Sequence, residues 1–403
     1  MKIMKVMYFT IEGFDVPNAN NHLAQTMIET FLENGIEVYL LQSFSNGPEP
    51  IVPDSIKDNP NFSYDIVSRK RAKKNNFLGR YFEGIQYAFN AKKKWKHHIS
   101  TIDAVIVQST YLSWLSIKML KKCNRNIIFS IFDLFPDVVF DVGASRSKLI
   151  FKVLDRLQSI CYKQSKKVIV ITDDVKEKLV KKGVPNSKLG KIVNWFNEKQ
   201  VAEVQRDNNA FIRKYSISEK KFYVQYAGNF GYTFNYRFVI EVAKLLSSFD
   251  DIEFHMIGSG TFEKEFKEEA ACCNNIKFFP WQPLNIISDV YSSCSIGFIP
   301  LSKGVIGNSF PSKMPLIMAC HRTFVVCANM ESCFAKEVND NAIGICVSDS
   351  SPSDCAQAIL KLYKDNEMKK VYEDNALKYA HEEYGSKNNV DKFVKLLEGI
   401  RNE

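Results

Sequence analysis

The chain has 403 residues, of which 45% are hydrophobic and 25% are charged, as is ordinary for a folded globular protein. This length predicts two domains of about 150–200 residues each, because a single hydrophobic core rarely grows larger. No stretch reaches the ~18 uninterrupted apolar residues of a membrane span, and the first residues lack the pattern of a signal peptide, so the composition argues against an integral membrane protein and favours the cytosol.

The net charge of +9 belongs to the first half of the chain. Residues 1–195 contain 30 Lys and Arg against 18 Asp and Glu, a net of +12. Within residues 68–98 there are ten basic residues and a single acid, Glu83. A basic segment of this density indicates a surface that meets anions.

In the first half, apolar strand patterns alternate with helical ones. Strands are predicted at residues 2–9, 36–41, 103–109, 126–132 and 167–172. Helices are predicted at residues 20–35, 112–122, 149–164 and 175–182, the first of them ending at a glycine.

The same alternation restarts in the second half. Strands are predicted at residues 222–228, 252–260, 276–281, 294–301, 323–328 and 344–348. Helices are predicted at residues 236–248, 261–271, 286–292 and 352–364, at a position opening with Pro311, and over about the last 35 residues.

Strands and helices of these lengths predict parallel, doubly wound sheets. We expect an α/β protein with two Rossmann-like doubly wound parallel-sheet domains that face a cleft. The first domain is predicted at residues 1–195 and carries the basic segment 68–98; the second is predicted at residues 196–380. A C-terminal helix at residues 381–403 is expected to pack back on the first domain.

Ligands of doubly wound sheets bind beyond the carboxyl ends of the strands. The segments predicted to lie there are residues 10–20, 108–111, 132–137, 228–233, 258–260, 281–283 and 304–321. Three of these segments in the second domain are glycine turns, which lets a phosphorylated ligand approach the backbone closely. Each turn alone is also compatible with a plain tight turn.

The third turn, Gly-Asn-Ser-Phe-Pro-Ser-Lys at residues 307–313, adds a permanent cation. With Pro311 as the first helical residue, the backbone N–H groups of Ser312 and Lys313 would face outward. A diphosphate bound there would gain the helix dipole and a contact with Lys313.

In the first domain, Asp133 and Asp137 follow a buried strand, and His22 lies in the first turn of the first helix. Asp133 is a candidate site residue, whereas Asp137 is also explained as a cap of the following helix. His22 is interpreted as a surface or acceptor-contact residue. The ten cysteines form no C-x-x-C pair and the six histidines have no ligand spacing, so we expect reduced core thiols and no metal.

The basic segment 68–98 interleaves Lys and Arg with aromatic residues. A solvated basic face and a nucleic-acid patch remain alternatives, but no nucleic-acid module is visible. Aromatic and polybasic residues together favour contact with an anionic membrane surface. The residues predicted to make it are Arg69, Arg71, Lys73, Lys74, Arg80, Lys92, Lys93, Lys94 and Trp95.

Over essentially its full length, the chain resembles the GT-B glycosyltransferases of family 4 that build bacterial capsular and O-antigen polysaccharides. The resemblance rests on the order of many motifs. They are F-D-L-F-P-D at residues 132–137, V-I-V-I-T at 168–172, K-I-V-N-W-F-N-E at 191–198, Y-A-G-N-F-G at 226–231, F-H-M-I-G-S-G at 254–260, I-K-F-F-P-W-Q-P at 276–283, C-S-I-G-F-I-P-L at 294–301 and the stretch 307–328.

This resemblance implies a retaining transfer of a sugar from a nucleotide donor on the second domain to an acceptor on the first, without a metal. Residues implied to bind the nucleotide sugar are Asn229, Gly258, Ser259, Gly260, Trp281, Gln282, Asn308, Ser309, Ser312 and Lys313. Residues expected to bind the acceptor are Asn20, His22, Asp133 and Asp137. Asp133 and Lys313 are the predicted catalytic residues.

The chain departs from the family at the donor loop. The family's two glutamates are replaced by Asn308 and Leu316, and Asn229 stands where an arginine is usual. Donor contacts therefore shift to Ser312 and Lys313.

We expect an enzyme of the hexosyltransferase class, cytoplasmic and peripheral on the inner face of the cell membrane. Its predicted partners are a UDP-sugar and a polyprenyl-diphosphate-linked saccharide, and it needs no cofactor. The alternatives are a nucleotide-sugar epimerase on the same fold and a non-catalytic partner subunit with a degenerate donor site.

Overall fold

The computed structural model describes residues 3–16, 20–69, 77–123, 126–143 and 145–402. The chain divides into two compact units. The first comprises Met1–Phe140, Ser145–Asn194 and Ser386–Glu403, and the second comprises Asp141–Ala144 and Trp195–Gly385. The domain boundaries predicted from the sequence fall at residues 196 and 381.

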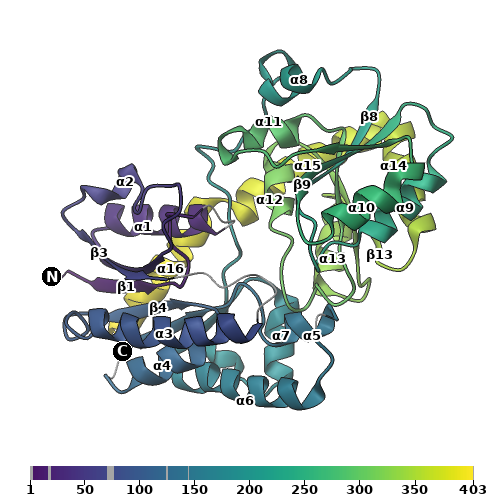
Figure 1. Ribbon diagram of the computed structural model, residues 1–403. Coiled ribbons are helices and arrows are strands. Elements are labelled where there is room, and N and C mark those ends of the chain that lie inside the picture. The colour runs from purple at the N-terminus through teal and green to yellow at the C-terminus, as the bar shows by residue number, and fades with distance from the viewer. Residues whose placement is uncertain (1–2, 17–19, 70–76, 124–125, 144, 403) are drawn as a thin grey trace. The chain divides into compact units, whose positions relative to one another are not determined.

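The first unit is built on a seven-stranded parallel sheet with the strand order β3-β2-β1-β4-β5-β6-β7 (Figure 1). Its strands are β1 (Lys5–Phe9), β2 (Glu37–Phe44), β3 (Phe62–Ser68), β4 (Ala104–Gln108), β5 (Asn126–Ser130), β6 (Lys167–Val170) and β7 (Leu189–Lys191). Most strand residues are apolar and buried, because helices cover both faces of a parallel sheet.

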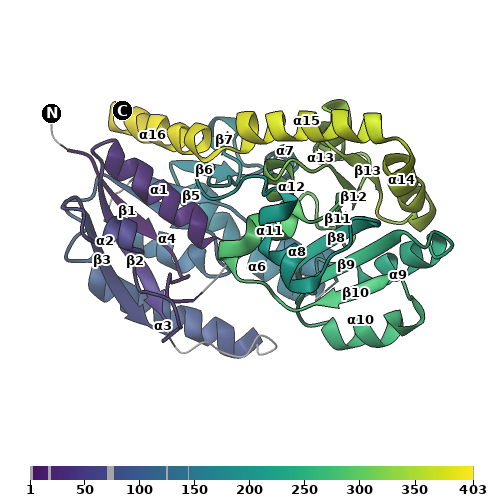
Figure 2. The same cartoon turned by 90° about the horizontal axis from the view of Figure 1, so that it is seen from above.

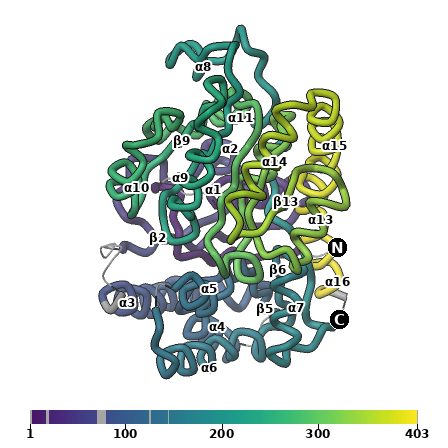
Figure 3. The backbone as a smooth tube through the Cα atoms, turned by 90° about the vertical axis from the view of Figure 1, so that its right-hand side faces the viewer, coloured from purple at the N-terminus to yellow at the C-terminus, as the bar shows by residue number. Residues whose placement is uncertain are grey.

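Helices α3, α4 and α6 form one covering layer, and Figure 3 shows α4 and α6 side by side. Helices α1 and α16 pack against each other in the same unit, as Figure 2 shows. The helices of this unit are α1 (Asn21–Glu33), α2 (Asp54–Lys57), α3 (Phe77–Trp95), α4 (Ser113–Lys121), α5 (Asp137–Asp141, whose last residue belongs to the second unit), α6 (Lys148–Gln164), α7 (Asp173–Lys181) and α16 (Ser386–Asn402).

The second unit has a six-stranded parallel sheet in the order β10-β9-β8-β11-β12-β13. Its strands are β8 (Phe222–Asn229), β9 (Ile252–Ser259), β10 (Ile276–Phe279), β11 (Ile296–Pro300), β12 (Phe324–Ala328) and β13 (Ile345–Ser348). Its helices are α8 (Ala210–Tyr215), α9 (Tyr236–Leu245), α10 (Glu263–Glu269), α11 (Ile287–Ser292), α12 (Lys313–Ala319), α13 (Cys333–Asp340), α14 (Pro352–Lys364) and α15 (Asn366–Tyr384).

In both sheets the first strand is internal. Strand β1 lies between β2 and β4, and β8 lies between β9 and β11. The direction of chain progression reverses at these strands, and the loops beyond their carboxyl ends diverge. The fold therefore sets one candidate ligand position in each unit, at the ends of β1 and β8.

Two predicted helices differ in the structure. The helix expected to open with Pro311 begins at Lys313, with Ser312 as its N-cap. The predicted C-terminal helical region is two helices, which meet at Gly385. A side chain at residue 385 would lie 2.6 Å from Glu198 Oε1 and 2.8 Å from the His381 carbonyl oxygen, so glycine permits the close packing there.

We predict that Leu397→Ala lowers the free energy of unfolding of the first unit by ~2–5 kcal/mol, because it empties a buried position. Leu397 is 0% exposed on α16, the helix that packs against α1. Urea denaturation followed by circular dichroism measures the change. Lys395→Ala, at an exposed position of the same helix, should shift stability by less than about 0.5 kcal/mol. Equal effects of the two substitutions would contradict the packing of α16.

Candidate functional site

The carboxyl ends of β8 and β9 meet through glycine. Gly258 has φ +143°, and a Cβ atom there would lie 1.9 Å from the carbonyl oxygen of Gly228. The backbone N–H of Phe230 donates to the Ser259 carbonyl oxygen at 2.8 Å, which ties the two turns together. Gly258 is thus required for the approach of the two strands, and this explains the glycine without any ligand.

Lys313 lies across the end of β8. Its Nζ is 4.7 Å from the ring centroid of Tyr226, two residues before Gly228 on that strand. A Cβ atom on Gly228 would lie 2.4 Å from Lys313 Cε and 2.9 Å from Nζ. The absence of a side chain at residue 228 therefore leaves the space that the lysine occupies.

The environment of Lys313 disfavours its positive charge. Burial lowers the pKa of Lys313 to about 8, and no acidic side chain contributes to this shift among the described residues. An ammonium group held away from water without a counter-charge gains strongly from an arriving anion. The ring of Tyr226 supplies only a weak cation–π contact of about 0.5–2 kcal/mol. The position is therefore suited to an anionic ligand at neutral pH.

Asn229 and Gly260 lie at the same strand ends. The Tyr226 hydroxyl donates to the Asn229 carbonyl oxygen at 2.8 Å. A Cβ atom on Gly260 would lie 2.5 Å from Asn229 Oδ1, so this glycine makes room for the asparagine side chain. Asn229 and Ser259 are exposed. The structure thus brings Asn229, Ser259, Gly260 and Lys313 to adjacent strand ends of one unit.

Asn308 lies in the loop between β11 and α12, and its side chain is buried in the protein. Its side chain is 1% exposed, and Nδ2 donates to Asp141 Oδ2 at 2.8 Å and to the Gly304 carbonyl oxygen at 2.7 Å. Both amide hydrogens are used within the second unit, which corrects the prediction that this amide binds the ligand. A glutamate at residue 308 would set a second negative charge against Asp141.

The remaining predicted residues of the second unit are spread along its loops. Trp281 follows β10 and is 56% exposed. Gln282 is buried, and its Nε2 donates to the Tyr215 hydroxyl at 3.1 Å and to the Pro280 carbonyl oxygen at 2.7 Å. Ser309 is half-buried and Ser312 is exposed at the start of α12.

In the first unit, Asp133 and Asp137 have different environments. Asp133 is exposed beyond the carboxyl end of β5. Asp137 is 2% exposed, and its carboxylate forms two ion pairs. Lys178 Nζ lies 3.1 Å from Oδ1 and Lys182 Nζ lies 2.6 Å from Oδ2. The predicted acceptor contact of Asp137 is therefore wrong, because its carboxylate is held inside the unit by two lysines.

Asn20 and His22 lie at the start of α1, which follows the loop after β1. Both are half-buried. Since β4 alone separates β1 from β5 in the sheet, His22 and Asp133 belong to the same carboxyl edge. Their joint role in binding an acceptor stays a prediction.

The described part of the basic segment is residues 68–69 and 77–98, of which Phe77–Trp95 form the helix α3. Trp95 is 1% exposed and belongs to the hydrophobic core, so its predicted membrane contact is wrong. The Arg69 side chain, 10% exposed, pairs with Glu83 and donates to the Ile11 carbonyl oxygen at 2.6 Å, so it is also committed to the interior. Arg80 lies over the Tyr111 ring, 5.5 Å from its centroid.

Three of the predicted membrane residues, Arg71, Lys73 and Lys74, lie outside the described residues. Lys92, Lys93 and Lys94 are exposed in the last turn of α3, and Lys94 lies 3.3 Å from Asp65. This end of α3 is where the described part of the segment keeps an exposed positive charge.

Tyr226 and Asp141 contact predicted site residues and were not singled out from the sequence. Gly228 opens the Gly-Asn-Phe-Gly turn, which is one of the three glycine turns predicted from the sequence. Tyr226 looks like any buried strand residue, and Asp141 lies 167 positions before the asparagine that it contacts. No local pattern identifies either of these two.

Neither cysteines nor acidic and histidine clusters form a metal site in the part of the chain that the structure describes. All ten cysteines are free thiols. No group of three or more His, Cys, Asp or Glu side chains among the described residues could hold a metal ion.

Two family models match the chain in succession. Residues 21–199 match "Glycosyltransferase Family 4" and residues 207–379 match "Glycosyl transferases group 1". The probable glycosyltransferase WbjE of Pseudomonas aeruginosa is 23% identical over 291 residues, which cover 71% of this chain and 72% of that protein.

Solved structures share the two-domain fold. Sucrose-phosphate synthase of Thermosynechococcus elongatus matches with a TM-score of 0.76 at 13% identity and covers 99% of both chains. HepE of Anabaena, solved in complex with UDP-glucose, matches with a TM-score of 0.73 at 11% identity and covers 98% of this chain and all of that one. At these identities the likeness shows the fold, which is GT-B.

We predict that Lys313 titrates well below an ordinary lysine, whose pKa is about 10.4, because burial lowers its pKa to about 8. Competitive acylation at a series of pH values, read by mass spectrometry, should give half-maximal reactivity of Lys313 near pH 8. A short lysine peptide in the same reaction serves as the reference. Titration of Lys313 together with the peptide would contradict the desolvated environment.

Proposed function

Because the chain is a glycosyltransferase of the GT-B type, we propose that it transfers a sugar from a UDP-sugar to a lipid-diphosphate-linked saccharide. The transfer retains the configuration of the anomeric carbon and serves the synthesis of capsule, O-antigen or another exopolysaccharide. The reaction takes place at the cytoplasmic face of the membrane and needs no metal.

The observation that carries this proposal is the positive charge of Lys313, which is half-buried and has no described counter-charge. Its ammonium group lies at the end of β8 beside two glycine turns and receives no stabilisation from a described carboxylate. A nucleoside diphosphate supplies the missing counter-charge. HepE, which shares the fold, was solved with UDP-glucose, and this supports UDP as the nucleotide.

Lys313 also favours departure of the nucleotide. When the bond between the anomeric carbon and the diphosphate breaks, negative charge grows on the leaving phosphate oxygen. A cation already in place and poorly hydrated stabilises that charge more than it stabilises the ground state. The ordinary route by which proteins neutralise a diphosphate without a metal is such a lysine together with backbone N–H groups.

The acceptor hydroxyl is activated without a protein nucleophile in this proposal. The leaving phosphate takes the proton of the acceptor hydroxyl on the same face from which it departs, which accounts for retention. Asp133 positions the acceptor hydroxyl from the first unit, and it is suited to this because its carboxylate is exposed at the carboxyl edge of the sheet. Asn20 and His22 are proposed to contact the saccharide.

A second candidate is a non-catalytic partner subunit, favoured by Asn308 and Leu316 standing where the family carries acids. The position of Lys313 at the end of β8, without a described counter-charge, weighs against it, because such a position gains from an anionic ligand. Calorimetric titration separates the two functions. Heat of UDP binding at micromolar to millimolar concentration supports the enzyme, and its absence supports the subunit.

We predict that Lys313→Ala lowers turnover at least ~10²-fold, the scale expected for loss of one group that stabilises transition-state charge. The measurement is mass-spectrometric detection of product from a panel of UDP-sugars and lipid-linked acceptors. Lys303→Ala removes an exposed cation of the same loop and should leave turnover within about twofold, because surface charges contribute little. Near-normal turnover of the Lys313 variant would overturn its role, and product with an epimerised donor sugar would instead support an epimerase.

The proposed membrane contact rests on α3 and α6 of the first unit. Phe82 on α3 is 69% exposed, and Phe89, seven residues later on the same face, is 52% exposed. On α6, Leu149, Ile150 and Val153 are each more than half exposed. Exposed lysines follow on α3, and apolar side chains beside lysines suit an anionic lipid interface. No described helix is long and apolar enough to cross a bilayer.

We predict that Phe82→Ser combined with Phe89→Ser reduces co-sedimentation with phosphatidylglycerol vesicles at least about fivefold, because two apolar anchors are lost. Leu245→Ser serves as the matched control, since Leu245 is 53% exposed on α9 of the second unit. Unchanged vesicle binding by the double variant would reject α3 as the contact, and loss of binding by the control would point to general destabilisation.

A further inference from the structure

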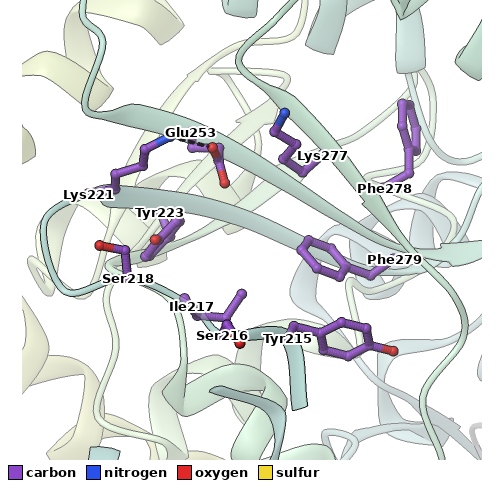
Figure 4. A pocket seen from close by; sticks show the side chains of 10 residues that line it. All are labelled: Tyr215, Ser216, Ile217, Ser218, Lys221, Tyr223, Glu253, Lys277, Phe278 and Phe279. Carbon is purple, nitrogen blue, oxygen red and sulfur yellow. Dashed lines mark hydrogen bonds and ion pairs between the residues drawn. The ribbon is translucent and has the colours of Figure 1, made fainter. Parts of the chain in front are cut away.

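A pocket lies in the second unit, away from Lys313. It has a volume of about 380 Å³, and its lining residues include Tyr215, Lys221, Tyr223, Glu253, Lys277 and Phe279 (Figure 4). Tyr223 is the second residue of β8, Glu253 is the second residue of β9 and Lys277 is the second residue of β10. The pocket therefore opens at the amino-terminal half of the sheet.

The distance from the donor turns follows from strand geometry. Five residues separate Tyr223 from Gly228 along β8, which is about 17 Å at the rise of a parallel strand. A diphosphate held by Lys313 does not reach the pocket over that distance. Any ligand of the pocket is thus a different molecule, or a second copy of the first one.

The single carboxylate of the pocket is already satisfied. Glu253 accepts from Lys221 Nζ at 2.7 Å through one oxygen and from His255 Nε2 at 2.9 Å through the other. These contacts lower the pKa of Glu253 to about 2, with the hydrogen bond from His255 as the largest cause. The carboxylate is therefore ionised and engaged, and it is a poor acceptor for a ligand.

The unpaired charge of the pocket is a cation. Lys277 is exposed and forms no ion pair with a described residue. Figure 4 shows its amine on the same side of the pocket as the pair of Lys221 and Glu253. Ser216 and Ser218, both exposed, also line the pocket. An unpaired ammonium group beside hydroxyl groups that can donate suits an anionic ligand group.

The floor of the pocket is aromatic. The rings of Tyr215 and Phe279 lie 5.0 Å apart between centroids, and Phe279 lies 4.8 Å from the ring of the fully buried His255. Tyr223 in turn lies 4.3 Å from His255. A partly exposed aromatic surface next to cationic groups accepts the flat face of a ring.

We propose that this pocket binds a small phosphorylated ligand with a planar ring, of the class of nucleoside monophosphates. The phosphate contacts Lys277 and Lys221 together with the serine hydroxyls, and the ring packs on Phe279 and Tyr215.

The pocket is connected to the segment predicted to line the nucleotide base. Gln282 donates to the hydroxyl of Tyr215, and Phe279 leads through Pro280 to Trp281. Trp281 lies two residues from Phe279 and is 56% exposed, so we expect tryptophan fluorescence to change when a ligand packs on Phe279.

The test uses the full chain and adenosine monophosphate as the probe, measured by calorimetry and by tryptophan fluorescence. The measurements are made in the Lys313→Ala chain, so that binding at the donor turns does not contribute. In this chain we expect Lys277→Gln to weaken binding at least about tenfold, the scale of one charge-assisted contact. Lys264→Gln, at an 84% exposed side chain of α10, is the matched control and should have no effect.

Two further ligands test the two halves of the proposal. Adenosine lacks the phosphate and ribose 5-phosphate lacks the planar ring, and each should bind at least about tenfold more weakly than the whole probe. Equal binding of either one overturns the corresponding half. No binding of adenosine monophosphate at millimolar concentration to a chain that is folded by circular dichroism, or unchanged binding in Lys277→Gln, overturns the proposal. These outcomes do not depend on whether the chain transfers sugar from UDP.

Discussion

An uncompensated positive charge at the end of β8 is the constraint on which the second unit depends. Lys313 keeps its ammonium over the ring of Tyr226, in space that exists because residue 228 is glycine. Holding a charge in this way costs stability in the empty protein, and the cost is visible in the lowered pKa of Lys313. Charged groups that destabilise the empty protein are common at sites where a bound ligand of opposite charge stabilises them.

Neighbouring features of the second unit fit this constraint. Gly258 and Gly260 bring β8, β9 and the Asn229 side chain close together, so the backbone around the lysine is compact. Asn308 ties the loop before α12 to Asp141, and the neutral amide is what allows that carboxylate to lie there. At residue 308, the amide is thus used in contacts within the protein.

Most of the alternation of strands and helices, and the parallel class of both sheets, could be predicted from the sequence, because most elements carry their own hydrophobic period. The two edge strands of the first sheet were not predicted, because β3 mixes polar residues into its pattern and β7 has only three residues. The position of Lys313 near the strand ends could also be predicted, since it is the cation that follows a glycine turn and a proline. The predicted start of its helix, Pro311, lies two residues before the observed start at Lys313. Proline is a common first residue of helices, but here it precedes the N-cap Ser312.

Other parts of the site depend on contacts between distant residues. Tyr226 meets Lys313 because β8 lies beside β11 in the sheet, and sheet order is not written in any local pattern. The same limit explains the two errors in the first unit. Trp95 and Asp137 occur in segments rich in charge, where the sequence suggests exposure, yet the fold buries Trp95 in the core and pairs Asp137 with two lysines.

The most direct test of the account is the uptake of protons when UDP binds. With a pKa of about 8 in the empty protein, Lys313 is mostly neutral at pH 8.5 and becomes protonated when the diphosphate arrives, so binding should take up roughly 0.7 proton. Calorimetry in two buffers of different ionisation enthalpy measures this number. The account predicts that the uptake is lost in Lys313→Ala. Binding of UDP without proton uptake, or with the same uptake in the variant, would contradict it.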